Sequence, residues 1–148
     1  MVKKILLPTD GSENAIKAGE YAISLADMSG AEILILNVID TSYLNAIPQP
    51  EVRESVDEEL RNDMENAVKK FEETIEDNKC GGTCKNINFK VLLKEGNPSE
   101  VILKTIVDEE IDQVVMGKSG KHGLEKFLLG RTTDRVVKES KVPVNIIS

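Results

Sequence analysis

Three glycines punctuate one segment of the chain in a pattern that can hold an anion. Gly117 and Gly120 flank two residues, and Gly130 follows after nine more. Glycine permits positive φ and lets a ligand approach the main chain closely. The helix expected to open at or just after Gly130 would offer unpaired N–H groups and a partial positive charge. The segment therefore predicts a cradle for phosphate and ribose, and three plain turn-forming glycines are the alternative.

The charge around these glycines differs from that of the rest of the chain. Residues 117–138 carry a net charge of +4, whereas the whole chain of 148 residues carries −7. The acidic remainder would repel nucleic acid and anionic lipid, so we expect neither as a partner. A basic patch at a glycine loop fits a small anionic ligand, and a basic solvated face is the alternative.

Apolar runs and amphipathic stretches alternate along the chain and indicate the elements that position this loop. Strands are expected at residues 3–7, 32–39, 88–94, 113–116 and 142–147, and helices at 14–28, 51–78, from 98 onwards and at 132–139. Residues 40–50 hold two prolines and are expected to form a loop. Ser12 and Asn97 are candidate N-caps, and Gly30 is a candidate helix end.

This alternation predicts an α/β fold in a single domain spanning residues 1–148. We expect an open parallel five-stranded sheet in the order 3-2-1-4-5, with right-handed crossovers and helices on both faces. Ligands bind such sheets beyond the carboxyl ends of the strands, where the winding direction reverses. With strands one and four adjacent, Asp10, the end of strand two at residues 38–40 and Gly117 converge on one crevice.

Two common phosphate-binding sequences are missing from the chain. The turn after the first strand holds one glycine, Gly11, and therefore lacks the G-x-G-x-x-G dinucleotide fingerprint. The sequence G-x-x-x-x-G-K-[ST] occurs nowhere. Phosphates are therefore expected after strand four, at Gly117, Gly120 and Gly130.

Several segments together resemble the universal stress protein family. They are Pro8-Thr9-Asp10, Asn37-Val38-Ile39-Asp40, Val115-Met116-Gly117, the G-x2-G-x9-G glycine pattern and Pro143-Val144. The resemblance covers essentially the whole chain and looks like the branch whose members bind ATP. It implies a fold of the adenine nucleotide alpha hydrolase type. It also implies a homodimer joined through the C-terminal strand at residues 143–147.

The resemblance further implies the contacts of an adenine nucleotide, whether ATP, ADP or AMP. Asp10 would lie near the adenosine or phosphates, and the Val38 main chain would read the adenine edge. A divalent ion, Mg²⁺ or Mn²⁺, is compatible with a bridge between Asp10 and the phosphates. The expected cofactor-binding residues are Pro8, Thr9, Asp10, Val38, Met116, Gly117, Ser119, Gly120, Gly130, Arg131, Thr132 and Thr133.

The chain departs from the family pattern directly after the third glycine. The family usually has Ser or Thr there as a hydroxyl donor to phosphate, whereas this chain has Arg131 followed by Thr132 and Thr133. Arg131 can pair with phosphate bidentately. Alternatively, its side chain can point away from the site, so that Thr132 or Thr133 contacts the phosphate instead. Ser119 stands where the family usually has histidine, and His122 is expected to be an exposed loop residue.

Composition and short motifs limit the other kinds of site. Cys80, Cys84 and the single histidine, His122, are fewer than the four ligands that zinc needs, so no metal site is expected. The two cysteines are expected to be reduced thiols, with a redox pair as the alternative. The basic N-terminus precedes only three apolar residues before Pro8, which is no signal peptide, and no apolar run is long enough to cross a membrane. We expect a cytoplasmic protein.

No group of residues in the sequence matches a known type of catalytic site. The leading hypothesis is therefore a nucleotide-binding regulatory protein of the stress response. One alternative is a dimeric interaction module that binds no nucleotide because Arg131 blocks the pocket. The other is a slow ATPase that a partner activates.

Overall fold

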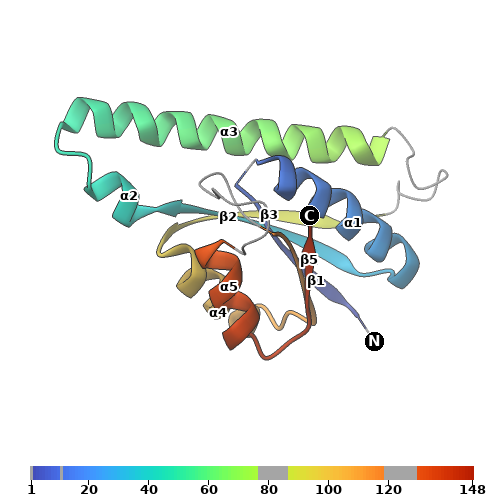
Figure 1. Cartoon of the computed structure of the whole chain (residues 1–148). Helices are drawn as coiled ribbons and strands as arrows, with labels where there is room; N and C mark the ends of the chain where they lie inside the picture. Colours follow the sequence, from blue (N-terminus) through green and yellow to red (C-terminus); the bar gives the residue numbers. More distant parts are fainter. Residues whose placement is uncertain (1, 11, 77–86, 119–129) are drawn as a thin grey trace.

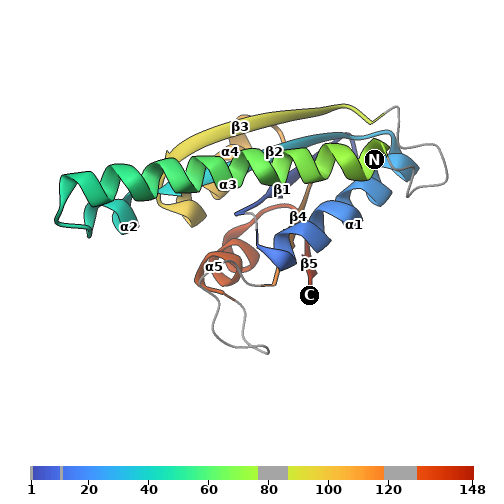
Figure 2. The same ribbon diagram turned by 90° about the horizontal axis from the view of Figure 1, so that it is seen from above.

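The computed structural model describes residues 2–10, 12–76, 87–118 and 130–148. Its strands form one parallel sheet in the order β3-β2-β1-β4-β5, as predicted (Figures 1 and 2). The strands are β1 (Lys4–Pro8), β2 (Glu32–Asp40), β3 (Phe89–Gly96), β4 (Gln113–Gly117) and β5 (Val144–Ile147). The helices are α1 (Glu13–Ser29), α2 (Thr41–Asn45), α3 (Pro50–Glu76), α4 (Pro98–Asp108) and α5 (Arg131–Glu139).

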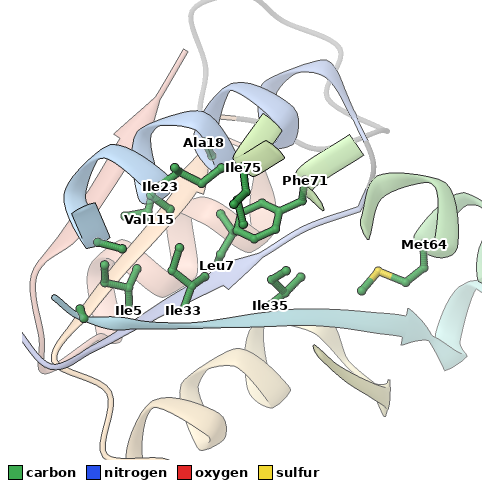
Figure 3. Close-up of a cluster of buried hydrophobic side chains, with 13 residues drawn as sticks. Ile5, Leu7, Ala18, Ile23, Ile33, Ile35, Met64, Phe71, Ile75 and Val115 are labelled. Carbon is green, nitrogen blue, oxygen red and sulfur yellow. The ribbon is translucent and has the colours of Figure 1, made fainter. Parts of the chain in front are cut away.

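Helices cover both faces of the sheet, so the expected α/β architecture is confirmed. On one face, α1 and α3 bury a cluster that Figure 3 shows closing over the strands, with Phe71 of α3 directed toward Leu7. Phe71 also meets Phe89 of β3 edge to face, with ring centroids 5.2 Å apart. On the other face, α4 and α5 cover a second cluster in which Ile106 and Val136 pack with strand residues. This double burial explains why the central strands read as continuous apolar runs.

The predicted helix ends are confirmed at three positions. Ser12 caps α1, because its Oγ accepts a hydrogen bond from the main-chain N–H of Ala15 at 3.2 Å. Asn97 caps α4 and accepts from the N–H of Glu100 at 3.1 Å. Gly30 ends α1 in the left-handed conformation, with φ of 75°, which glycine adopts without steric cost.

The expected loop at residues 40–50 was wrong in part, because residues 41–45 form the short helix α2. The Asp40 carboxylate caps this helix and accepts hydrogen bonds from the N–H groups of Ser42 and Tyr43 at 3.0 and 3.3 Å. Figures 1 and 2 show α2 beside the N-terminal end of α3, beyond the sheet. The remaining described element boundaries differ from the expected ones by one or two residues, as local signals at helix and strand ends allow.

Candidate functional site

A cavity of about 530 Å³ opens where the carboxyl ends of β1, β2 and β4 meet. All five helices contribute to its walls, so it lies at the point where the sheet reverses its winding direction. Every predicted site residue that the structure describes lines it: Pro8, Thr9, Asp10, Val38, Met116, Gly117, Gly130, Arg131, Thr132 and Thr133. The other two, Ser119 and Gly120, lie outside the described residues, as do His122 and both cysteines.

The turn after β1 is held in place from two sides. Asp10 accepts a hydrogen bond from the N–H of Ser12 at 2.9 Å, which closes the turn into α1. Thr9 donates its N–H to the carbonyl of Leu36 at 2.8 Å. The side-chain amide of Asn37 donates to the carbonyl of Thr9 at 2.8 Å. Asn37 thereby ties β2 to the turn that presents Asp10, a role that the sequence analysis missed.

Gly117 is required by packing at the end of β4. A Cβ at this position would lie 2.9 Å from Cβ of Asn14 and 3.0 Å from its carbonyl carbon. These atoms belong to the first turn of α1 and include its main chain, so they cannot move aside as a flexible side chain would. The missing side chain of Gly117 therefore lets the start of α1 approach the end of β4 closely at the edge of the cavity.

The N-terminus of α5 forms another wall of the cavity. Gly130 is its N-cap, in an extended conformation, and as a glycine it brings no side chain to cap the helix. The first N–H groups of such a helix lack intrahelical partners and carry partial positive charge. Gly130 itself donates its N–H to the carbonyl of Lys118 at 3.1 Å, which joins the start of α5 to the end of β4. This wall is suited to an anion.

The three side chains after Gly130 differ in what they offer a ligand. Thr133 is 3 % exposed and its hydroxyl donates to the carbonyl of Gly117 at 3.1 Å. Its one hydroxyl proton is thus engaged within the protein. Thr132 is half-buried, and Arg131 is exposed at the first helical position. Of the two predicted threonine substitutes for the family hydroxyl, Thr132 is the one left available as a donor.

The basic patch expected from the sequence is partly neutralised by neighbouring acids. Arg135 bonds to Glu139 at 2.7 Å, and this hydrogen bond raises the pKa of Arg135. It also lies 3.6 Å from Glu100. Lys138 pairs with Asp134 at 3.0 Å. Of the cations on α5, Arg131 is the one that lines the cavity.

The β2 side of the cavity combines apolar side chains with the polar Asn37 and Asp40. Its walls include Val38 of β2, Leu60 of α3 and Ile102 of α4. Tyr43 of α2 also lines it and is 44 % exposed. Tyr43 and Leu60 were not predicted, because their positions depend on α2 and on the docking of the long helix α3. The local signal for α2 was the capping carboxylate of Asp40. The two prolines of residues 40–50 led us to expect a loop there instead.

Over residues 2–10, 12–76, 87–118 and 130–148, no group of three or more His, Cys, Asp and Glu side chains is arranged to hold a metal ion. The same residues contain no helix long and apolar enough to cross a membrane.

The fold and its strand order are shared with known proteins. A universal stress protein of Methanocaldococcus jannaschii is 32 % identical over 167 residues, covering 99 % of this chain and 95 % of the relative. A solved universal stress protein from Lactobacillus plantarum is 26 % identical, with a TM-score of 0.78 and coverage of 99 % and 98 %.

Two more distant structures of the same fold hold nucleotides. A universal stress protein in complex with cAMP is 18 % identical, with a TM-score of 0.67 and coverage of 99 % and 96 %. One from Archaeoglobus fulgidus in complex with dAMP is 14 % identical, with a TM-score of 0.66 and coverage of 100 % and 98 %. The family profile of the universal stress proteins matches residues 1–148. This chain belongs to the universal stress protein family.

Proposed function

We propose that this chain is a regulatory protein of the universal stress response that binds an adenine nucleotide, ATP or alternatively ADP or AMP. The observation that carries the proposal is a cavity of about 530 Å³ that combines apolar side chains with a helix N-terminus whose N-cap is glycine. Sites for small molecules usually enclose roughly 300–1,000 Å³. The cAMP and dAMP in the two distant relatives share the adenine base with ATP.

The phosphates are proposed to lie against α5. The N–H groups of its first turn and the hydroxyl of Thr132 supply donors, and Arg131 supplies a full positive charge. Arg131 thus takes over the charge compensation for a polyphosphate, while Thr132 takes over the hydroxyl contact. The adenosine is proposed to extend toward β2, where the main chain of Val38 reads the adenine edge.

Asp10 is proposed to lie beside the ribose and the first phosphates. Its carboxylate already accepts the N–H of Ser12, but a carboxylate has room for further partners. A Mg²⁺ or Mn²⁺ ion carried in with the nucleotide can bridge this carboxylate and the phosphates. Oxygen ligands from one carboxylate and from substrate phosphates are the usual way in which proteins hold Mg²⁺.

We also propose that the chain acts in the cytoplasm as a homodimer joined through β5. In the sheet β5 pairs with β4 alone, which leaves its other edge as an end of the five-stranded order. A sheet edge with unpaired N–H and carbonyl groups can extend into a second copy of the same strand. Binding of nucleotide, rather than its turnover, is the proposed regulatory signal.

The test begins with the protein as purified. We expect denaturation to release adenine nucleotide, detected by mass spectrometry, and the nucleotide-free protein to bind Mg-ATP in isothermal titration calorimetry. Even a Kd of 1 mM corresponds to about −4 kcal/mol and is measurable. A chain that releases nothing and gives no heat with millimolar Mg-ATP would rule out the proposal and favour the nucleotide-free interaction module. Steady conversion of ATP to ADP would instead favour the slow ATPase.

Arg131→Ser tests the phosphate end of the site. Charge-assisted hydrogen bonds contribute about 1.5–3 kcal/mol, so we expect ATP affinity to fall roughly 10- to 150-fold and AMP affinity to change little. Lys138→Ser is the matched control, since it removes one positive charge from the same helix outside the cavity lining. Tighter ATP binding by Arg131→Ser would show that Arg131 obstructs the site.

A further inference from the structure

Helix α2 carries an aromatic side chain to the wall of the cavity. Tyr43 lines the cavity and is 44 % exposed. The chain holds two tyrosines and no tryptophan, and the other tyrosine, Tyr21, does not belong to the cavity lining. Aromatic rings that stay half-exposed beside a cavity offer a flat apolar surface to a ligand.

The backbone that carries Tyr43 is held on both sides. Asp40 caps the helix and accepts the N–H of Tyr43 itself. Leu44, the next residue, is 8 % exposed and anchors α2 in the protein interior. After the helix, Arg53 of α3 donates to the carbonyl of Ile47 at 2.8 Å, which ties the connection to α3. The backbone position of Tyr43 is therefore fixed by hydrogen bonds and packing on both sides.

The cavity that Tyr43 lines holds apolar side chains as well as the carboxylate of Asp40. Leu60 of α3 and Pro98 and Ile102 of α4 line the same cavity. These helices follow β2 and β3 in the chain, whereas the anion-binding wall of α5 follows β4. Strand β1 lies between β2 and β4, so the ends of β2 and β4 are about 10 Å apart, two inter-strand spacings. A ligand that reaches from α2, which follows β2, to the start of α5 can thus meet Tyr43 at one end and Arg131 at the other.

We propose that Tyr43 stacks on the base of the bound nucleotide and makes the site selective for purines. This inference rests on the proposed nucleotide-binding function and adds the residue that selects the base. A purine presents a larger π-face than a pyrimidine, so stacking on one aromatic ring favours ATP and GTP over CTP and UTP. The main chain at Val38 then distinguishes adenine from guanine.

Calorimetry with three titrants separates the base from the phosphates. Loss of stacking by truncation of an aromatic side chain weakens binding by about 5- to 150-fold per base. We expect Tyr43→Leu to lose ATP affinity by this factor, and Tyr43→Phe, which keeps the ring, to bind ATP as the unaltered chain does. Inorganic tripolyphosphate, which has no base, should bind Tyr43→Leu and the unaltered chain equally. UTP should bind the unaltered chain more weakly than ATP and lose little in Tyr43→Leu.

Tyr21→Leu is the matched control. Tyr21 is 43 % exposed, nearly the same as Tyr43, but it lies on α1, where its hydroxyl accepts a hydrogen bond from Asn145 at 3.0 Å. We expect this variant to keep the ATP affinity of the unaltered chain. Far-ultraviolet circular dichroism of each variant shows that the fold is retained.

Tyrosine fluorescence provides a second readout. In Tyr21→Phe the only emitter is Tyr43, and in Tyr43→Phe it is Tyr21. We expect ATP to quench the emission of Tyr21→Phe in a saturable way with the calorimetric Kd, and to leave Tyr43→Phe unchanged.

The outcomes separate the two proposals. ATP binding that is equal in the unaltered chain and in Tyr43→Leu, or an absence of quenching in Tyr21→Phe, would overturn the stacking role and leave nucleotide binding intact. No ATP binding by the unaltered chain would overturn both.

Discussion

Gly117 illustrates how a residue can satisfy a binding motif for a reason that lies in packing. The glycine pattern predicted a ligand-lining position, and the structure places Gly117 at the cavity. Its lack of a Cβ is nevertheless explained by Asn14 of α1, 2.9 Å from where that atom would be. The start of α1 is thereby held against the end of β4, where the proposed nucleotide site is built.

We expect Gly117→Ala to destabilise the fold by about 1–3 kcal/mol, the usual cost of overpacking a close contact. Gly19→Ala is the matched control within α1. Its Cβ would meet Phe71 and Leu7 at 3.6 and 3.8 Å, which is ordinary contact, and alanine is favoured over glycine inside a helix by about 0.5–1 kcal/mol. Urea denaturation should move the midpoint down for Gly117→Ala and up for Gly19→Ala. Equal midpoints for both variants would contradict the packing role.

Asn37, beside the same site, has a buried polar atom that costs folding free energy. It is 6 % exposed, and its amide oxygen has no hydrogen-bond partner within the described part of the chain. A buried acceptor without a partner costs about 1–3 kcal/mol. The nitrogen of the same amide holds the carbonyl of Thr9, so this cost accompanies the fixed position of the turn that carries Asp10.

At the scale of elements, the start of β1 is fastened to the start of β4 by one carboxylate. Asp112 accepts hydrogen bonds from the N–H groups of Lys3 and Lys4 at 2.8 and 2.9 Å. These bonds favour the ionised form and lower the pKa of Asp112 below its usual value. Lys4 also contacts the segment before β4, because its Nζ donates a hydrogen bond to the carbonyl of Glu109 at 3.1 Å. The junction joins residues more than 100 positions apart.

This junction predicts a pH dependence of stability. A carboxylate with a lowered folded pKa stabilises the fold above its unfolded pKa, and the contribution is lost as the pH falls through the folded pKa. Asp112→Asn removes the charge, so we expect a loss of about 1 kcal/mol at pH 7, shrinking as the pH falls below about 4. Urea melts at pH 7 and pH 3 measure the difference, with the exposed Asp108→Asn as control. A loss that is the same at both pH values would mean that the charge of Asp112 contributes nothing.

At the scale of the whole molecule, the direction of the β5 hydrogen bonds determines how a second copy could pair with it. The carbonyls of Pro143 and Ile147 accept hydrogen bonds at 2.9 Å from the N–H groups of Val114 in β4 and of Lys118, the residue after β4. Because main-chain groups alternate in direction along a strand, those of Val144 and Ile146 point to the open edge. In the proposed dimer, these outward groups carry the hydrogen bonds between the two copies.

Ile146→Pro therefore tests the proposed dimer. Proline removes one outward N–H and leaves the inward bonds to β4 in place, so the sheet edge tolerates it while strand addition does not. We expect light scattering after size exclusion to report a monomer for Ile146→Pro. Ile146→Ala, which trims the same side chain and keeps the N–H, should remain a dimer. A dimeric Ile146→Pro would place the dimer interface elsewhere.

The sequence by itself determined the features that depend on neighbouring residues. The alternation of apolar runs and amphipathic stretches predicted the parallel sheet and the helices on both faces, and the structure confirms both. The expected strand order 3-2-1-4-5 is also confirmed. Ser12, Asn97 and Gly30 marked helix ends correctly. Capping and hydrophobic periodicity act over three or four residues, so they can be read along the chain.

Only the tertiary structure decided what each residue of the cavity does. Helix α2 and Tyr43, the bond from Asn37 to Thr9 across 28 positions, and the bond from Thr133 to Gly117 across 16 have no local signature. The structure also shows that the basic patch is partly neutralised, because Arg135 and Lys138 pair with acids on their own helix. These roles depend on which elements lie side by side and at what distance, and that is settled when the sheet and its helices pack together.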